Sequence, residues 1–182
     1  VILLKENIDE QLKKRVRKKQ KQSLRQANKA ERIGVTVRPG TGRDWERYFT
    51  LYQLSQKRWG QTTQAYPLQT FKKIARCQAD YPVMWVAEYE KKVVAGMLCF
   101  MHQKHACYWH GVAHHDYFYT GANTLLHHQI MALETISWYD LNASAGLDSV
   151  ERFKESLGAV PLPLWKFTRH AFFFQNYQHF RA

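Results

Sequence analysis

The chain of 182 residues contains 27 Lys and Arg against 15 Asp and Glu, which gives a formal net charge of +12. With 45% hydrophobic and 14% aromatic residues it is not a disordered chain, and its length suits one domain with a sizeable core. No apolar run reaches the roughly 18 residues that a membrane span needs, so the sequence predicts a cytoplasmic protein without one.

The chain begins with an apolar stretch and continues into a long basic helix. Residues 1–5 predict the end of a preceding domain or a linker, as if the chain were cut from something longer, and 6–182 predict a single domain. Over 6–33, apolar residues follow a narrow helical stripe, and Gly34 is typical of a helix end. Residues 13–32 hold ten basic side chains and one acid. Two interpretations stay open for them: a solvated helix face, or a surface that attracts tRNA or another polyanion.

The middle of the chain changes from helical to strand spacing. A short strand at 34–38 precedes two helices, and three strands with short connections follow, which predicts an antiparallel meander. The two predicted helices cover 43–58 and 67–78, and the three strands cover 83–89, 93–100 and 106–112. The cysteines of this region have apolar neighbours and predict buried free thiols in a reducing compartment: Cys77, Cys99 and Cys107.

The last third predicts alternating helices and strands. A helix over 120–138 leads into a short strand at 138–141, and a helix over 149–157 ends at Gly158. Two aromatic-rich strands complete the chain, at 164–170 and 172–180. The whole order predicts one α/β domain, in which a mixed, mostly antiparallel sheet is covered by helices.

Three pieces of this sequence carry a resemblance to a known family. They are the helix start at 119–126, the Tyr139-Asp-Leu strand and the segment 146–159. The last piece contains Phe153 and Lys154 in the spacing Phe-Lys, three residues, Gly. Together they resemble the Fem-type peptidyltransferase branch of the GNAT N-acyltransferase superfamily.

The resemblance implies a GNAT fold and the transfer of an acyl group to an amine of a cell-envelope, peptidoglycan-like precursor. The donor is an aminoacyl-tRNA in Fem-type enzymes and an acyl-CoA in other GNAT enzymes, and neither is a tightly bound cofactor. Fem-type proteins usually have two such domains, so an upstream GNAT-like domain is an expected partner. The alternatives are a CoA-dependent N-acetyltransferase of a small molecule or polysaccharide, and a non-catalytic module that binds an anion or RNA.

Acyl transfer to an amine needs a stabilised oxyanion and a group that removes the amine proton. The resemblance places Lys154 at the acyl-transfer centre and Phe153 in the substrate channel, whereas on their own they would be a solvated lysine and a core phenylalanine. Asp140 lies in an apolar strand, where it either pairs with a base such as Arg152 or Lys154 or accepts the proton. A histidine at the end of the third strand, His114 or His115, is a candidate general base, and we take His114 as the first choice.

Further candidates concern substrate and donor binding. Arg58, which precedes a Gly as in the family, either stabilises the fold by pairing or binds an acidic substrate, and Tyr108 and Arg152 join it as substrate-binding candidates. The segment 118–126 occupies the position of the pyrophosphate loop of CoA-using GNAT enzymes, whose free N–H groups hold the diphosphate. Its candidates are Thr120, Gly121, Ala122 and Asn123. Phe118 replaces the expected basic or amide residue and Thr120 a glycine, which disfavours acetyl-CoA, although Gly121 permits a tight turn.

Seven of the nine histidines crowd between residues 102 and 128. No Cys-x-x-Cys or His-Glu-x-x-His spacing is present, and we expect the pairs His114-His115 and His127-His128 to point their rings apart. The sequence therefore predicts no metal site.

Overall fold

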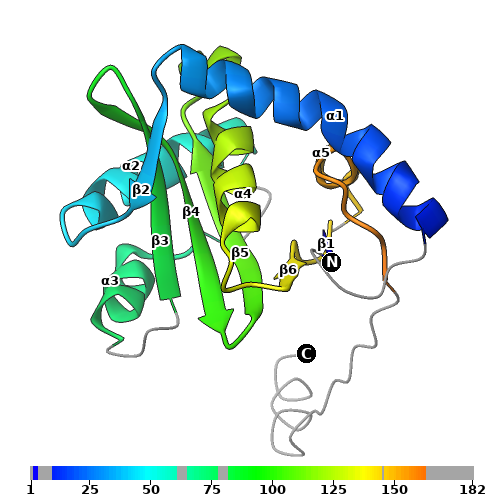
Figure 1. Ribbon diagram of the computed structural model, residues 1–182. Coiled ribbons are helices and arrows are strands. Elements are labelled where there is room, and N and C mark those ends of the chain that lie inside the picture. The colour runs from blue at the N-terminus through cyan, green and yellow to red at the C-terminus, as the bar shows by residue number, and fades with distance from the viewer. Residues whose placement is uncertain (1, 4–9, 61–64, 78–81, 145, 163–182) are drawn as a thin grey trace, which may run out of the picture.

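A six-stranded mixed sheet forms the centre of the computed structural model (Figure 1), which describes residues 2–3, 10–60, 65–77, 82–144 and 146–162. The strand order is β1-β6-β5-β4-β3-β2, and every neighbouring pair is antiparallel except β5 and β6. The strands are β1 (Ile2–Leu3), β2 (Thr36–Pro39), β3 (Pro82–Tyr89), β4 (Lys92–His102), β5 (His105–Ala113) and β6 (Trp138–Asp140). The predicted α/β class, the meander and the mostly antiparallel mixed sheet are confirmed.

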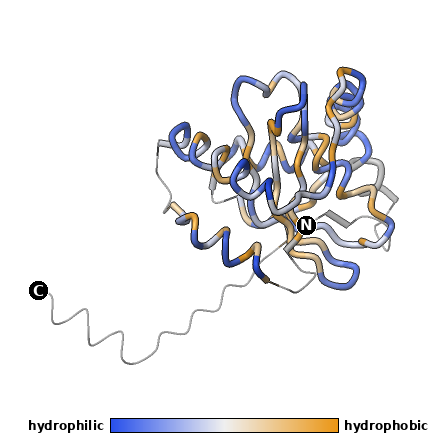
Figure 2. Tube along the Cα trace, turned by 90° about the vertical axis from the view of Figure 1, so that its left-hand side faces the viewer, coloured by the Kyte–Doolittle hydropathy of each residue, from blue (hydrophilic) through white to orange (hydrophobic). Residues whose placement is uncertain are grey.

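Helices cover both faces of the sheet. On one face α1, α4 and α5 enclose one core, and on the other α2 and α3 enclose a second (Figure 1). In Figure 2 hydrophobic and hydrophilic residues alternate along the helices, as expected where one side of a helix packs on a sheet. The helices are α1 (Glu10–Arg32), α2 (Asp44–Arg58), α3 (Leu68–Arg76), the 3₁₀ helix η1 (His115–Thr120), α4 (Ala122–Ala132) and α5 (Asp148–Ser156). None of the described helices is long and apolar enough to cross a membrane.

The long helix α1 is held by its small-residue stripe and by the way it ends. Ser23, Ala27 and Ala30 are buried at helical spacing, on the side that packs on α4. Gly34 has φ of +94°, and the N–H of Val35 reaches back to the carbonyl of Ala30 at 3.0 Å, which closes the last turn. The predicted end at Gly34 is confirmed, whereas the predicted start lies outside the described residues.

A bulge in β5 decides which side chains face which core. Cys99 of β4 pairs with Tyr108 and Leu98 pairs with His110, so Trp109 is an extra residue without a partner in the pairing. Tyr108 therefore packs with the α1–α4 core, while Trp109 and His110 both meet the aromatic core under α2.

Two predictions differ from the structure, and the prediction for the first residues stays open. The predicted helix over 120–138 ends at Ala132, and Leu133 is extended, because the N–H of Trp138 must reach the carbonyl of Lys104 at 3.0 Å to begin β6. The helical spacing of apolar residues extends past Ala132 because Ile136 is also buried, but Ile136 lies in the irregular segment after the helix. The three cysteines are free thiols, but Cys77 is exposed and Cys107 is only partly buried, so the predicted burial is correct for Cys99. Ile2 and Leu3 pair with β6, so they add a strand to this sheet; the preceding domain stays a prediction.

Two predicted strands, at 164–170 and 172–180, lie outside the described residues.

Candidate functional site

An open cleft separates β5 from β6. The two strands pair only over three residues of each, from His105↔Trp138 to Cys107↔Asp140. Asn142 then turns the chain with φ of +63°, and its side-chain amide donates to the carbonyl of Tyr108 at 3.1 Å. Beyond this point no strand of the described residues lies beside the outer edge of β5, and a cavity of about 370 Å³ lies there.

The open edge of β5 presents backbone groups to this cleft. The N–H of His114 donates to the carbonyl of Val94 across the β4–β5 pair, so hydrogen-bonded positions alternate from there along the strand. By this alternation the N–H and C=O groups of Gly111 and Ala113 point away from β4 and toward the cleft. The carbonyl of Ala113 indeed accepts from Arg58 at 3.3 Å.

The N-terminus of α4 forms a second wall of the cleft. Gly121, with φ of +73°, turns the chain from η1 into α4, and it packs so closely on α1 that a Cβ there would lie 3.1 Å from the carbonyl of Gln26. The buried Thr120 hydroxyl accepts from the N–H of Ala122 at 3.2 Å. The N–H groups of Asn123 and Thr124 have no partner earlier in the helix, so they and the helix dipole place positive potential at the cleft.

Four residues were predicted to bind a cofactor on this segment. Gly121, Ala122 and Asn123 line the cleft, whereas Thr120 lies behind them and caps the helix start. Their roles in binding stay predictions.

The positively charged side chain of Arg58 lies at the mouth of the cleft. The guanidinium carbon of Arg58 is 4.9 Å from the ring centroid of Phe118 and 5.7 Å from that of Trp59. Burial lowers the pKa of Arg58 from its usual value. The position at 118 thus lacks a basic side chain, but Arg58 brings a positive charge to the same place from a different element.

The floor of the cleft is aromatic. Tyr108 and Phe153 line it, and the ring of His127 lies behind them at 5.0 Å and 5.4 Å between centroids. The Nδ1 atom of His127 lies 2.7 Å from the hydroxyl of Tyr139, and burial lowers the pKa of His127 to about 3. Burial raises the pKa of Tyr108. Both groups are therefore neutral at neutral pH.

Sequence reasoning missed two residues that shape this floor. A Cβ on Gly111 would overlap the hydroxyl of Tyr108, so only glycine leaves room for that side chain in its present place. His127 was noticed only as one of many histidines, although its apolar neighbours on the predicted helix were a sign of burial.

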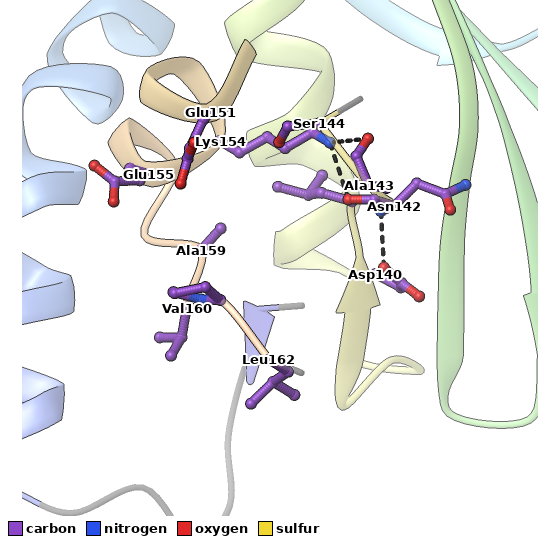
Figure 3. Close-up of a pocket in the computed structure, with 12 residues that line it drawn as sticks. Asp140, Asn142, Ala143, Ser144, Glu151, Lys154, Glu155, Ala159, Val160 and Leu162 are labelled. Atoms are coloured by element: carbon purple, nitrogen blue, oxygen red, sulfur yellow. Dashed lines mark hydrogen bonds between the residues drawn. The ribbon is translucent and has the colours of Figure 1, made fainter. Parts of the chain in front are cut away.

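Lys154 and Asp140 lie in a different cavity, on the other side of α5, with a volume of about 460 Å³ (Figure 3). The Lys154 ammonium donates to the carbonyls of Asn142 and Ala143 at 2.9 Å and 2.8 Å. Burial lowers the pKa of Lys154, and Asp140 raises it. Asp140 accepts the N–H of Asn142 at 2.7 Å. These bonds hold the turn that follows β6.

The structure thus separates residues that the sequence places together. Lys154 and Phe153 are neighbours in the chain, but the first faces this second cavity and the second faces the cleft. Lys154 is buried rather than solvated, and in the described part of the chain no ion pair joins Asp140 to Lys154 or Arg152. Arg152 is exposed on α5 and lines neither cavity. Catalytic roles for Lys154 and Asp140 stay predictions.

His114 lies at the end of β5, next to the cleft-lining Ala113. Its ring stacks on that of His115, with 5.4 Å between centroids and 8° between planes. The expectation that these two rings point apart is wrong, because η1 bends the chain at this point. For the second pair it is confirmed: His127 faces Tyr139, whereas His128 bonds the hydroxyl of Ser23 at 3.0 Å.

Comparisons with known proteins identify the family and the fold. Residues 14–155 match the family described as "Acetyltransferase (GNAT) domain". No curated protein matches the sequence. Among solved structures, FemX is similar with a TM-score of 0.66 at 9% identity, over 81% of this chain and 56% of that one.

Two further structures are similar over most of their own length. A possible acetyltransferase from Clostridium difficile 630 gives a TM-score of 0.63 at 14% identity, over 75% of this chain and 97% of that one. An aminoglycoside acetyltransferase from an uncultured soil metagenomic sample gives 0.58 at 14% identity, over 75% and 96%. At these identities the likeness shows the fold alone. The family match covers most of the chain, and it shows that the chain belongs to the GNAT acetyltransferase family and is an N-acyltransferase.

Proposed function

We propose that this N-acyltransferase takes an acyl group from acyl-CoA held in the cleft between β5 and β6, and transfers it to an amine of a cell-envelope precursor. The observation that carries the proposal is the meeting of two backbone sites in one cavity: the open edge of β5 at Gly111 and Ala113, and the N-terminus of α4 at Asn123. The arm of CoA contains amides that can form hydrogen bonds with the backbone of a strand edge. Its diphosphate can bind the free N–H groups of a helix N-terminus.

The residues of the cleft take the following parts in this proposal. Arg58 adds a cation for the anionic donor, and Phe153 packs against the acyl arm. The acceptor amine attacks the acyl carbonyl and the C–S bond breaks. Tyr108, which lines the cleft and is neutral, donates from its hydroxyl to the developing negative charge. The amine proton passes to the departing thiolate of CoA, so the products are the amide and the free thiol. Lys154 has a structural part in this proposal, because it holds the turn after β6.

We base the proposed class of acceptor on the resemblance to Fem-type enzymes, not on a contact seen in the cleft. The Phe-Lys spacing and the Tyr139-Asp-Leu strand resemble Fem-type enzymes, and the fold is similar to that of FemX. We therefore place the amine on a peptidoglycan-like precursor, with an aminoglycoside-like small molecule or a polysaccharide as the other class to assay.

Calorimetric titration with acetyl-CoA tests the donor. Asn123→Asp places a carboxylate at the α4 N-terminus, which stabilises the helix by about 0.3–1 kcal/mol but repels a diphosphate. We expect at least tenfold weaker binding with no loss of thermal stability. Asn28→Asp makes the same charge change on the exposed side of α1 and should bind as the wild type. Equal binding by all three proteins, or none by the wild type, contradicts an acyl-CoA donor in this cleft.

An aminoacyl-tRNA is the second candidate donor, and one observation favours it. Exposed basic side chains follow α1, and in the described part of the helix only Lys19 forms an ion pair, with Glu155 at 3.2 Å. Reversing Arg17, Lys21 and Arg25 to Glu tests this surface. If it recruits RNA, binding should be steeply salt-dependent in the wild type and lost in the variant, while acetyl-CoA fails to bind. RNA binding that is equal in both proteins removes α1 from donor recruitment.

A further inference from the structure

The end of β5 and the start of η1 bring three metal-binding side chains together. One ligand atom from each of His114, His115 and Asp116 lies within 4.8 Å of the other two. The Nε2 atom of His115 is 2.8 Å from one carboxylate oxygen of Asp116, and the Nδ1 atom of His114 is 3.8 Å from the other. Two imidazoles and one carboxylate form a donor set that suits zinc and its neighbours among the divalent transition metals.

The arrangement of these two histidine rings differs from that of consecutive residues in a β-strand. Successive side chains of a strand point to opposite faces, yet the rings of His114 and His115 lie within 8° of parallel. The turn at η1 causes this, because the N–H of Tyr117 donates to the carbonyl of His114 at 3.1 Å and the Tyr117 ring meets the His114 ring edge-on. The two imidazoles are thus held side by side by the backbone.

The cluster is also open to an ion from solution. The side chains of His115 and Asp116 are 65% and 63% exposed, and that of His114 is 28% exposed. A surface ion pair between His115 and Asp116 would account for one of the contacts. It does not involve His114, whose Nδ1 atom lies 3.8 Å from the other oxygen of the same carboxylate. That atom accepts the N–H of Asp116 at 3.3 Å, a long hydrogen bond that a metal ion would replace at the same lone pair.

We propose that His114, His115 and Asp116 bind a divalent transition metal ion of the zinc class, with water in the remaining positions. His114 directly follows Ala113, which lines the cleft, so the ion adds positive charge beside the cleft mouth. The inference does not depend on which acyl donor or acceptor the enzyme uses, and it is tested without an activity assay.

Zinc titration by calorimetry tests the site, with Co²⁺ absorbance as a second readout, on the whole chain without a polyhistidine tag. We expect one equivalent of Zn²⁺, bound at least tenfold more weakly by His115→Gln and by Asp116→Asn. His105→Gln, at the opposite end of β5, and Cys77→Ser, which removes an exposed thiol, should bind as the wild type. Circular dichroism checks that each variant is folded.

Each other outcome overturns the proposal. Absence of Zn²⁺ binding by the wild type removes the site, and so does equal affinity in the folded His115 and Asp116 variants. Loss of binding in Cys77→Ser or His105→Gln would assign the metal to those side chains instead.

Discussion

The Arg58 guanidinium lies over the ring of Phe118, 4.9 Å from its centroid, and donates to the Ala113 carbonyl on the open edge of β5. Arg58 ends α2 and Phe118 lies in η1, so the pair joins two elements at the cleft mouth. A planar cation held by an aromatic ring and a carbonyl is fixed in direction, which favours binding of an anion at one position.

Replacing Arg58 by Ala should weaken binding of the anionic donor about tenfold, because a charge-assisted hydrogen bond contributes roughly 1.5–3 kcal/mol. Thermal stability should change little, since the side chain is exposed. Calorimetric titration with acetyl-CoA measures the effect. Lys57→Ala removes a neighbouring exposed cation that does not line the cleft, and it should bind normally. If both variants bind alike, net charge rather than the position of Arg58 governs donor binding.

Asp44 anchors the start of α2 and should respond to both mutation and pH. Its fully buried carboxylate accepts from Arg38 at 2.7 Å and from the N–H of Thr41 at 2.8 Å. Asp44→Asn should lower the free energy of unfolding by about 2 kcal/mol, less than the 3–5 kcal/mol of a fully buried pair, because Arg38 is 34% exposed. Urea unfolding measures this, and Glu46→Gln on the exposed side of α2 should be nearly neutral.

The pH dependence of this effect has a definite sign. The hydrogen bond from Arg38 holds the pKa of Asp44 well below its usual range. A carboxyl with a lowered folded-state pKa contributes stability above its ordinary pKa of about 4 and loses it as the pH falls further. The difference between wild type and Asp44→Asn should therefore shrink at pH 3 relative to pH 7. A difference that stays constant contradicts the ion pair.

His127 should make the fold sensitive to mild acid. Its pKa is lowered to about 3 by burial, whereas the unfolded chain takes up a proton below about pH 6.5. Stability from a neutral buried histidine is present above 6.5 and falls by up to about 1.4 kcal/mol per pH unit between 6.5 and 3. His110, lowered to about 4, adds a similar slope.

His127→Asn keeps an atom near Nδ1 for the Tyr139 hydroxyl but cannot titrate. Its urea-unfolding free energy should fall less steeply between pH 6.5 and 4, by about 1.4 kcal/mol per unit, whatever its stability at pH 7. His105→Asn, which changes an exposed histidine, should keep the wild-type slope. A variant at 127 with an unaltered slope would mean that His127 is protonated in the folded protein.

Features that depend on short-range bonds could be predicted from the sequence. Gly34 and Gly158 end their helices with φ of +94° and +88°, and Glu90 and Lys91 form the tight β3–β4 turn. Each is decided by hydrogen bonds within about six residues, which a single window of sequence contains.

The candidate site depends on contacts between residues that are far apart in the sequence. The meeting of Arg58 and Phe118 follows from how α2 and η1 pack on the same end of the sheet. The bulge at Trp109 decides that Tyr108 faces the cleft, and a strict alternation cannot reveal it. Phe153 and Lys154 face different cavities because consecutive side chains of a helix point in different directions and different segments of the chain pack on each side of α5.

Lys154 can be tested for a structural role against a chemical one. Lys154→Met keeps the apolar stem but removes the donor to the carbonyls of Asn142 and Ala143. It should cost about 1–3 kcal/mol in urea unfolding, and acetyl-CoA binding in the cleft should stay within twofold of the wild type. Lys18→Met, on the exposed side of α1, is the matched control. Unchanged stability together with lost acyl transfer would instead place Lys154 in the chemistry.

Gly111 provides a test of the cleft floor itself. A Cβ at this position would overlap the Tyr108 hydroxyl, so Gly111→Ala forces the Tyr108 ring to move within a packed core. We expect a loss of about 1–3 kcal/mol in stability and a clear loss of donor binding, because the displaced ring narrows the cavity that it lines. Gly42→Ala adds the same methyl group where nothing lies within 4 Å and should leave both unchanged. If Gly111→Ala lowers stability but binds acetyl-CoA normally, the donor does not reach the floor formed by Tyr108 and Phe153. Retained binding in a variant of full stability would mean that the Tyr108 ring moves freely, and that the shape of this floor does not limit what the cleft accepts.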